Sequence, residues 1–320
     1  MKFGLKVFLV IAVVIVIALV VTSIMKSVMK VGQLKTKEFK IAKSSFKDWE
    51  SVLSHPGSIR VETLQAGEVY GTVHGLINMK NPKAAGIEDK KLSAPLLAHL
   101  IHHEKYGDFL IDTGFDSAFI EKTWGNFEGI LKKGAFKFRV EKGHEIEKLL
   151  ADRKVNLKGV FCTHFHEHQG GAPSLSNDIP FIFGKGEAEI SLFPIAFSRF
   201  LKDKTDLQAI DFNAAGDMPI VGKAVDIFGD GSLWAIATPG HTKGHTSYLV
   251  NGSEGPKMFV GDICMFGQSY ELGVESGGKF AEDLEANAQS FSKIKKFLDT
   301  YKQVKPVFGH ESDEFRIKYE

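Results

Sequence analysis

The sequence predicts an α/β domain built as a four-layer αββα sandwich behind one N-terminal transmembrane helix. Two observations support this: strand-like and helical segments alternate in two halves of the chain, and an apolar run without charged side chains opens it. Helices that cover the outer faces of two packed sheets give such a sandwich. The chain has 320 residues, 43% of them hydrophobic, which is enough for one large domain with a substantial core.

The expected elements follow from hydrophobic periodicity and from the Gly, Pro and Asn residues between apolar runs. The expected strands are residues 61–73, 97–111, 155–162, 224–237, 247–250, 257–260 and 304–308. The expected helices are residues 115–129, 144–151, 184–201 and 280–301. In 184–201, Phe193, Phe197 and Phe200 have near-helical spacing, which favours packing onto the sheet over a substrate wall or a membrane contact.

Residues 7–25 contain no charged side chain and are mostly Val, Ile, Leu, Ala and Phe. About 20 apolar residues cross a bilayer as a helix, whereas a cleaved signal peptide usually has a shorter apolar region. We therefore expect a tail at 1–6, a membrane anchor at 7–25 in contact with the lipid bilayer, a basic juxtamembrane linker at 26–57 and the folded domain at 58–320. Lysines flank the anchor on both sides, and the expectation is a folded domain outside the cytoplasm.

Three histidines and a glutamate crowd into residues 164–168, directly after an apolar run. Imidazole and carboxylate groups are ligands of zinc and similar cations. Three closely spaced histidines in a surface loop have no structural role, because they cannot form a core. Three further apolar runs lead through small residues into His241, Asp262 and His310. Because rigid strands deliver such side chains to one edge of a sheet, the pattern indicates a metal site that acts on a substrate.

These motifs, in this order, resemble the metallo-β-lactamase fold superfamily over residues 61–314. The resemblance also includes an early strand that ends in Asp112-Thr113-Gly114. It implies two divalent metal ions, most readily zinc, although iron and manganese accept the same ligands. The implied ligands are His164, His166 and His241 for one metal, His168, His310 and Glu167 for the other, and Asp262 as the bridge. Asp112 would fix the orientation of a ligand histidine through the N–H of its ring. His245 is expected to have a structural role.

The histidine run departs from the superfamily pattern H-x-H-x-D-H. It reads His164-Phe165-His166-Glu167-His168, one residue short, with a glutamate in place of the aspartate. A glutamate is one methylene longer and could reach across the shortened loop. Alternatively, Glu167 points to solvent and the second metal is weakly bound or absent.

Within the superfamily, the layout is similar to the N-acyl homoserine lactonase-like branch, and the chain ends soon after His310, without a helical glutathione-binding domain. This implies a membrane-anchored hydrolase that opens an ester or lactone of a small molecule by attack of metal-bound hydroxide. Met265 stands where that branch has a catalytic tyrosine, and Tyr270 is close in sequence. The alternatives are a β-lactamase-like or phosphodiesterase hydrolase, and a non-catalytic metal-binding or regulatory member.

The net charge and the cysteine content bear on two further questions, the kind of partner and the presence of disulfide bonds. The net charge of +1 argues against a nucleic-acid partner, because such a surface needs a basic excess. The two cysteines, Cys162 and Cys264, cannot form a disulfide framework, and we expect them to be buried core residues.

Overall fold

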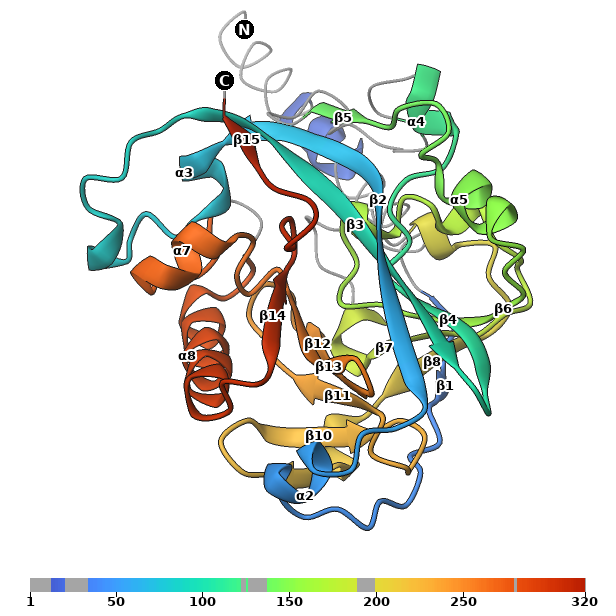
Figure 1. The fold of residues 1–320 in the computed structure, drawn as a ribbon. Helices are drawn as coiled ribbons and strands as arrows, with labels where there is room; N and C mark the ends of the chain where they lie inside the picture. Colours follow the sequence, from blue (N-terminus) through green and yellow to red (C-terminus); the bar gives the residue numbers. More distant parts are fainter. Residues whose placement is uncertain are drawn as a thin grey trace, which may run out of the picture.

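Two β-sheets pack face to face in the computed structural model, with helices on the outer side of each (Figure 1). The structure describes residues 13–20, 34–121, 125, 137–188, 199–278 and 281–319. Helices α4 and α5 lie on one side of the pair of sheets, and α7 and α8 lie on the other. The predicted α/β sandwich is therefore confirmed.

The first sheet has the strand order β1-β8-β7-β6-β4-β3-β2-β5, and β15 also pairs with β3. The strands are β1 Lys37–Glu38, β2 Ile59–Thr72, β3 Lys91–His103, β4 Gly107–Ile111, β5 Lys137–Arg139, β6 Leu157–Phe161, β7 Phe181–Gly184, β8 Leu207–Ile210 and β15 Lys318–Tyr319. Strands β4, β6, β7 and β8 run parallel, so the loops that follow them leave from the same edge of the sheet.

The second sheet has the order β14-β13-β12-β11-β10-β9. Its strands are β9 Gly216–Met218, β10 Gly222–Asp226, β11 Leu233–Ala237, β12 Thr246–Gly252, β13 Gly255–Gly261 and β14 Lys305–Phe308. Strands β11 and β13 each pair antiparallel with β12, and β14 runs parallel to β13. The carboxyl ends of β11, β13 and β14 therefore also share one edge.

Besides a helix at residues 13–20, the helices in the described part of the chain are α2 Trp49–Leu53, α3 Val73–Leu76, α4 Ala118–Glu121, α5 Ile146–Asp152, α7 Gly267–Leu272 and α8 Leu284–Thr300. Single 3₁₀ turns lie at η1 Pro82–Ala84, η2 Glu167–Gln169, η3 Ala172–Ser174, η4 Lys185–Ala188, η5 Arg199–Leu201 and η6 Phe212–Ala214. Asp283 is the N-cap of helix α8. Its side chain accepts from the backbone N–H groups of Glu285 and Ala286 and so satisfies donors that would otherwise lack a partner.

The buried apolar side chains form one layer between the two sheets and one on the outer face of each. Ile101, Phe161 and Tyr248 belong to the middle layer. Phe119 of α4 packs on the first sheet, and Phe297 of α8 packs on the second. Both sheets are therefore buried on two faces, which explains why their strands read as nearly continuous apolar runs.

Two of the expected strands are hairpins. Residues 97–111 divide into β3 and β4, which turn at Gly107, and residues 224–237 divide into β10 and β11. Gly107 has a φ of 90°, a conformation that glycine adopts without strain. In the expected helix 184–201, the turn η4 and Phe200 are described and Phe200 is buried in the core, whereas Phe193 and Phe197 lie outside the described residues.

The predicted linker at 26–57 is wrong from residue 34 onward. Strand β1 pairs with β8, and Trp49 is fully buried between Trp234 and Phe297, with ring centroids 5.2 Å from each. From residue 34 onward, the lysines that suggested a linker are exposed, as Lys37 is in its contact with Asp206. Residues 26–33 lie outside the described part of the chain.

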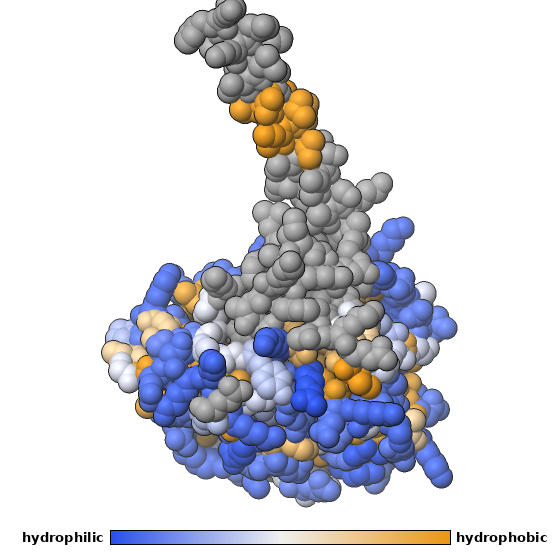
Figure 2. All heavy atoms as spheres, turned by 90° about the horizontal axis from the view of Figure 1, so that it is seen from above, coloured by the Kyte–Doolittle hydropathy of each residue, from blue (hydrophilic) through white to orange (hydrophobic). Residues whose placement is uncertain are grey.

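The predicted membrane anchor is also corrected. Residues 13–20 form a helix whose side chains are all exposed (Figure 2), while the rest of the predicted span, 7–12 and 21–25, is not described. Among the residues that the structure describes, no helix is both long enough and apolar enough to cross a membrane. This finding contradicts the predicted membrane localisation and gives the predicted transmembrane helix no support.

Candidate metal centre

The predicted ligands converge where the carboxyl ends of strands from both sheets meet. The histidine run follows β6 of the first sheet, while His241, Asp262 and His310 follow β11, β13 and β14 of the second. These side chains are buried, although their types are polar: His164, His166, Glu167, His168, His241, Asp262 and His310. A group of buried imidazoles and carboxylates from distant parts of the chain needs a partner to compensate its desolvation.

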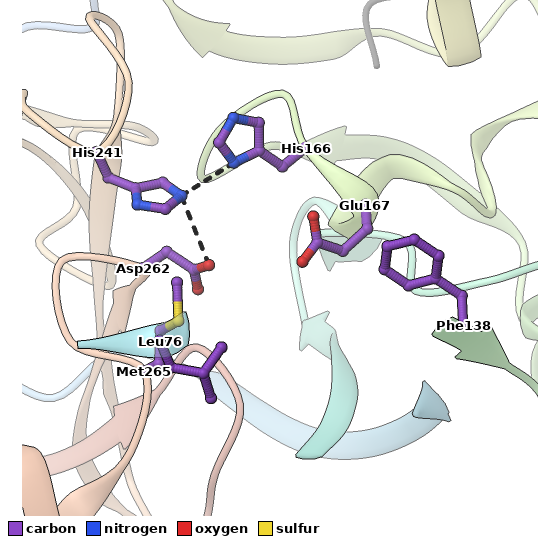
Figure 3. A pocket seen from close by; sticks show the side chains of 7 residues that line it. All are labelled: Leu76, Phe138, His166, Glu167, His241, Asp262 and Met265. Atoms are coloured by element: carbon purple, nitrogen blue, oxygen red, sulfur yellow. Dashed lines mark hydrogen bonds and ion pairs between the residues drawn. The ribbon is translucent and has the colours of Figure 1, made fainter. Parts of the chain in front are cut away.

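The first group of ligands consists of His164, His166 and His241, whose ligand atoms lie within 4.8 Å of one another. His166 Nδ1 is 2.9 Å from His241 Nε2. Asp262 Oδ2 lies 3.6 Å from His241 Nε2 and 3.8 Å from His164 Nε2. Figure 3 shows His166, His241 and Asp262 pointing toward one another.

The second group consists of Glu167, His168 and His310, again within 4.8 Å. Glu167 Oε1 lies 3.9 Å from His310 Nε2. Asp262 also contacts this group, since Oδ1 is 3.3 Å from His168 Nε2 and Oδ2 is 3.6 Å from His310 Nε2. Glu167 is therefore turned into the cluster and not to solvent, and Asp262 lies between the two groups.

The buried atoms of this cluster fit divalent cations. His164 Nε2 is buried and makes no hydrogen bond, a situation that is rare and costly in folded proteins, while His168 Nε2 and Asp262 Oδ1 are buried and lie 3.3 Å from each other. A cation coordinated by these atoms would compensate for it. The nitrogen and oxygen donors match zinc and related borderline metals.

The charge states differ within the cluster. Burial would lower the pKa of His168, but the nearby carboxylate of Asp262 outweighs it and raises the pKa to about 9. Burial lowers the pKa of His166 to about 3 and brings the pKa of His164 well below its ordinary value, so both rings are neutral, which is the form that binds metal. Burial would raise the pKa of Asp262, but His168 and His310 outweigh it and hold the pKa well below its usual range. Asp262 is therefore ionised.

Asp112 supports His164 through a hydroxyl group. Its carboxylate accepts from the Thr163 N–H (2.8 Å), from Thr163 Oγ1 (2.7 Å) and from Gln169 Nε2 (2.6 Å). Since the Thr163 hydroxyl donates to Asp112, it accepts from His164 Nδ1, 2.9 Å away. The remaining nitrogen of His164, Nε2, then faces the cluster without a proton.

His245 holds the backbone of Asp262. The Asp262 N–H donates to His245 Nε2 over 3.0 Å, so the ring proton lies on Nδ1, which contacts Thr238 Oγ1 at 2.9 Å. Burial lowers the pKa of His245 to about 4, in agreement with a neutral ring. At Gly261, φ is 60° and a Cβ atom would lie 2.6 Å from His245 Nε2, so the approach requires glycine.

A small pocket opens onto the cluster. Its polar side is formed by His166, Glu167, His241 and Asp262, and its apolar side by Leu76, Phe138 and Met265 (Figure 3). Its volume is about 10 Å³, roughly the space of one water molecule.

Tyr270 does not line this pocket. Its ring packs against Phe291 and Phe308 on α8 and β14, with Lys295 Nζ 4.4 Å above it. Sequence proximity to Met265 therefore does not bring the phenol to the cluster.

Two residues that contact the loops of the cluster, Gln169 and Glu187, are absent from the sequence-based predictions. Gln169 donates to Asp112 and also to the carbonyl oxygen of His164, and Glu187 contacts two ligand-bearing loops. The signal for Glu187 was its position next to Gly184 and Gly186, since paired glycines often mark a close backbone approach. Cys162 is buried, but in a different core layer from Cys264.

Comparisons with known proteins support the fold and the class of site. No family model matches the chain. The cytoplasmic hydroxyacylglutathione hydrolase of Arabidopsis thaliana is 33% identical over 142 residues, which is 42% of this chain and 44% of that protein. The chain thus spans less than half the length of this curated relative.

Solved structures match over most of the chain. An N-acyl homoserine lactone hydrolase with the product N-hexanoyl-L-homoserine bound at its catalytic metal centre superposes with a TM-score of 0.62 at 19% identity, covering 79% of this chain and 94% of that one. A dizinc quorum-quenching lactonase superposes with a TM-score of 0.54 at 15% identity, covering 88% and 97%. At such identities the likeness is evidence for the fold.

The chain has the metallo-β-lactamase fold, as the resemblance noted in the sequence implies, and its layout is similar to that of the lactone hydrolases among the solved structures.

Proposed function

We propose that this protein is a metal-dependent hydrolase that cleaves an ester or lactone of a small molecule with two divalent cations, most readily zinc. The observation that carries the proposal is the position of Asp262, whose carboxylate lies 3.3 to 3.8 Å from four buried histidines. A carboxylate between two ligand groups is suited to bridge two cations. Glu167 supports the second cation, because its side chain lies with His168 and His310.

The proposed ligands are His164, His166 and His241 on one side, Glu167, His168 and His310 on the other, and Asp262 between them. When bound, two such cations supply an activated water as the nucleophile and a Lewis acid that polarises the carbonyl. Asp112 holds the ring of His164 through Thr163, and His245 holds the backbone of Asp262. These contacts fix ligand orientation before a substrate arrives.

The apolar wall of the pocket would strengthen the electrostatics of the reaction. Leu76, Phe138 and Met265 face the polar ligands across the pocket, and exclusion of water makes charge–charge interactions stronger. Met265 has no hydroxyl to donate, so this wall would shield the reacting bond without supplying a proton.

The substrate class rests on the comparisons. The matched lactone hydrolase holds a ring-opened product at its metal centre, and the curated relative is named for hydrolysis of an acylated glutathione. Both names describe transfer of an acyl group to water, and a thioester is therefore a second candidate substrate. The non-catalytic reading required Glu167 to face solvent, and the position of Glu167 in the cluster favours the hydrolase.

The test is a hydrolysis screen of the full chain, loaded with zinc or manganese, on lactones, aryl esters and thioesters. We expect turnover of at least one class, and loss of turnover together with metal in His164→Ala and in His241→Ala. His55→Ala, at an exposed histidine, serves as the matched control and should retain both. Unchanged turnover in His241→Ala, or two bound metals without turnover of any substrate, would count against the proposal.

A further inference from the structure

Glu187, on the turn η4, is a buried carboxyl that the proposed mechanism does not use. Its side chain is 8% exposed and receives three donors. The backbone N–H of Phe165 lies 2.7 Å from Oε2, the N–H of Gly244 lies 3.1 Å from Oε1, and the hydroxyl of Thr242 also donates to Oε1.

The three donors belong to the loops that carry the metal ligands. Phe165 lies between His164 and His166 in the chain, and Thr242 directly follows His241. Gly244 directly precedes His245, which accepts from the backbone of Asp262. One carboxyl group thus connects the histidine run of the first sheet to the His241 turn of the second.

The backbone around Glu187 is packed too tightly to shift. A Cβ atom on Gly184 would lie 2.0 Å from the carbonyl oxygen of Gly244, and one on Gly186 would lie 2.6 Å from the Gly244 nitrogen. Contacts this short exclude any side chain at the two glycines. The turn that carries Glu187 is therefore seated directly on the loop that follows His241, and its carboxyl has a fixed position.

We propose that Glu187 is a positioning residue that sets the spacing between the His164–His166 loop and the His241 turn, and so shapes the first metal site. It contacts neither the pocket nor a proposed ligand side chain, and it acts through the backbone of both loops. The inference rests on the proposed metal-dependent function, but its test does not depend on turnover.

Asp226 provides a matched control for this test. It is 2% exposed and also accepts from two backbone N–H groups and one hydroxyl: Gly229 and Gly231 at 3.0 Å each, and Ser44 Oγ at 2.8 Å. Asp226 is the last residue of β10, and its partners lie in the turn after β10 and in the N-terminal segment, away from the ligand loops. A purely structural carboxyl should therefore behave as Asp226 does.

The experiment compares Glu187→Gln and Glu187→Ala with Asp226→Asn and Asp226→Ala. Zinc affinity is measured by competition with a chromophoric chelator, and thermal unfolding is measured on the metal-free proteins. We expect the Glu187 variants to lose roughly 10- to 100-fold in affinity for one of two zinc ions, as is usual for residues that orient ligands. The Asp226 variants should lose thermal stability but bind both ions as the unchanged chain does.

A second readout keeps the inference testable if the unchanged chain binds no zinc, a result that would overturn the proposed function alone. In nitrogen-15 spectra of the metal-free histidine side chains, the His166 and His241 signals should move in Glu187→Ala while the His310 signals remain. Thr242→Val, which removes one donor and leaves the carboxyl, should move the His241 signals alone. Glu187 variants that lose only thermal stability, with histidine signals and zinc affinity as in the Asp226 variants, would overturn the proposal.

Discussion

His310 donates its Nδ1–H to the carbonyl oxygen of Pro95, 3.0 Å away in the middle of β3. Because a carbonyl only accepts, the ring proton must lie on Nδ1, and Nε2 faces Glu167 and Asp262. The register of β2 against β3 shifts between Gln65 and Glu68, next to Pro95, and irregularities of this kind redirect backbone groups. A backbone carbonyl of the first sheet thus orients a proposed ligand that follows a strand of the second.

The length of the Glu167 side chain should decide whether the second metal binds. Glu167→Asp shortens the side chain by one methylene and withdraws the carboxylate from His310, so we expect the second zinc ion to bind at least about tenfold more weakly. Glu167→Ala should leave about one zinc ion per chain by elemental analysis after dialysis. Two retained ions in Glu167→Ala would mean that Glu167 is not a ligand.

The contact of Asp112 with His164 through Thr163 predicts that two different substitutions have the same effect. Asp112→Asn turns one acceptor into a donor, and Thr163→Val removes the hydroxyl between the two residues. Each should lower zinc affinity by roughly 10- to 100-fold, measured by chelator competition. An effect of Asp112→Asn without one of Thr163→Val would show that Asp112 acts through another contact, such as the one with His168, whose Nδ1 is 3.7 Å from it.

Trp49 tests whether the segment before β2 belongs to the folded domain. It is fully buried and donates its Nε1–H to the carbonyl oxygen of Pro219 over 2.8 Å. Trp49→Ala should lower the free energy of unfolding by about 3–5 kcal/mol, measured with urea. The exposed neighbour Lys47→Ala should change it by less than about 0.5 kcal/mol. A small effect of Trp49→Ala would restore the interpretation of this segment as a linker.

Asp230 should contribute to stability at neutral pH and lose that contribution in acid. Burial would raise the pKa of Asp230, but hydrogen bonds from Ser232 and the nearby His103 outweigh it and lower the pKa. The unfolded chain then binds the proton first as pH falls, so the contribution is complete above the ordinary pKa of about 3.9 and disappears as pH falls through the lowered value.

The measurement is the free energy of unfolding as a function of pH. Asp230→Asn should reduce the slope on the acid side by removing a contribution of no more than about 1 kcal/mol, since the group is partly exposed. Glu254→Gln, at an exposed site, should leave the slope unchanged. An equal slope in the Asp230 variant and the unchanged chain would contradict the assignment.

The convergence of the proposed ligands could be predicted from the sequence because each residue follows an apolar run, and the runs end at shared sheet edges. The contacts that orient these residues could not be predicted from the sequence. Pro95 lies far from His310 in the chain. Glu187 falls within the expected helix 184–201, and the sequence alone does not show that Gly184 and Gly186 approach a distant loop. The hairpins at β3–β4 and β10–β11 were merged for a similar reason, since apolar periodicity continues across a tight turn. Lys37 and its basic neighbours concealed the pairing of β1, because their charges face solvent whether or not the backbone is paired.

The proposed metal centre takes its ligands from both sheets: the histidine run follows β6, whereas His241, Asp262 and His310 follow strands of the second sheet. The two ligand groups are therefore complete only after the sheets have docked, and a cation held there would bind the native state and not the unfolded chain. By linkage, free metal at 100 times its dissociation constant would add about 2.7 kcal/mol to the free energy of unfolding. Removal of the metal by a chelator would then weaken the association of the two sheets and also abolish the proposed hydrolysis.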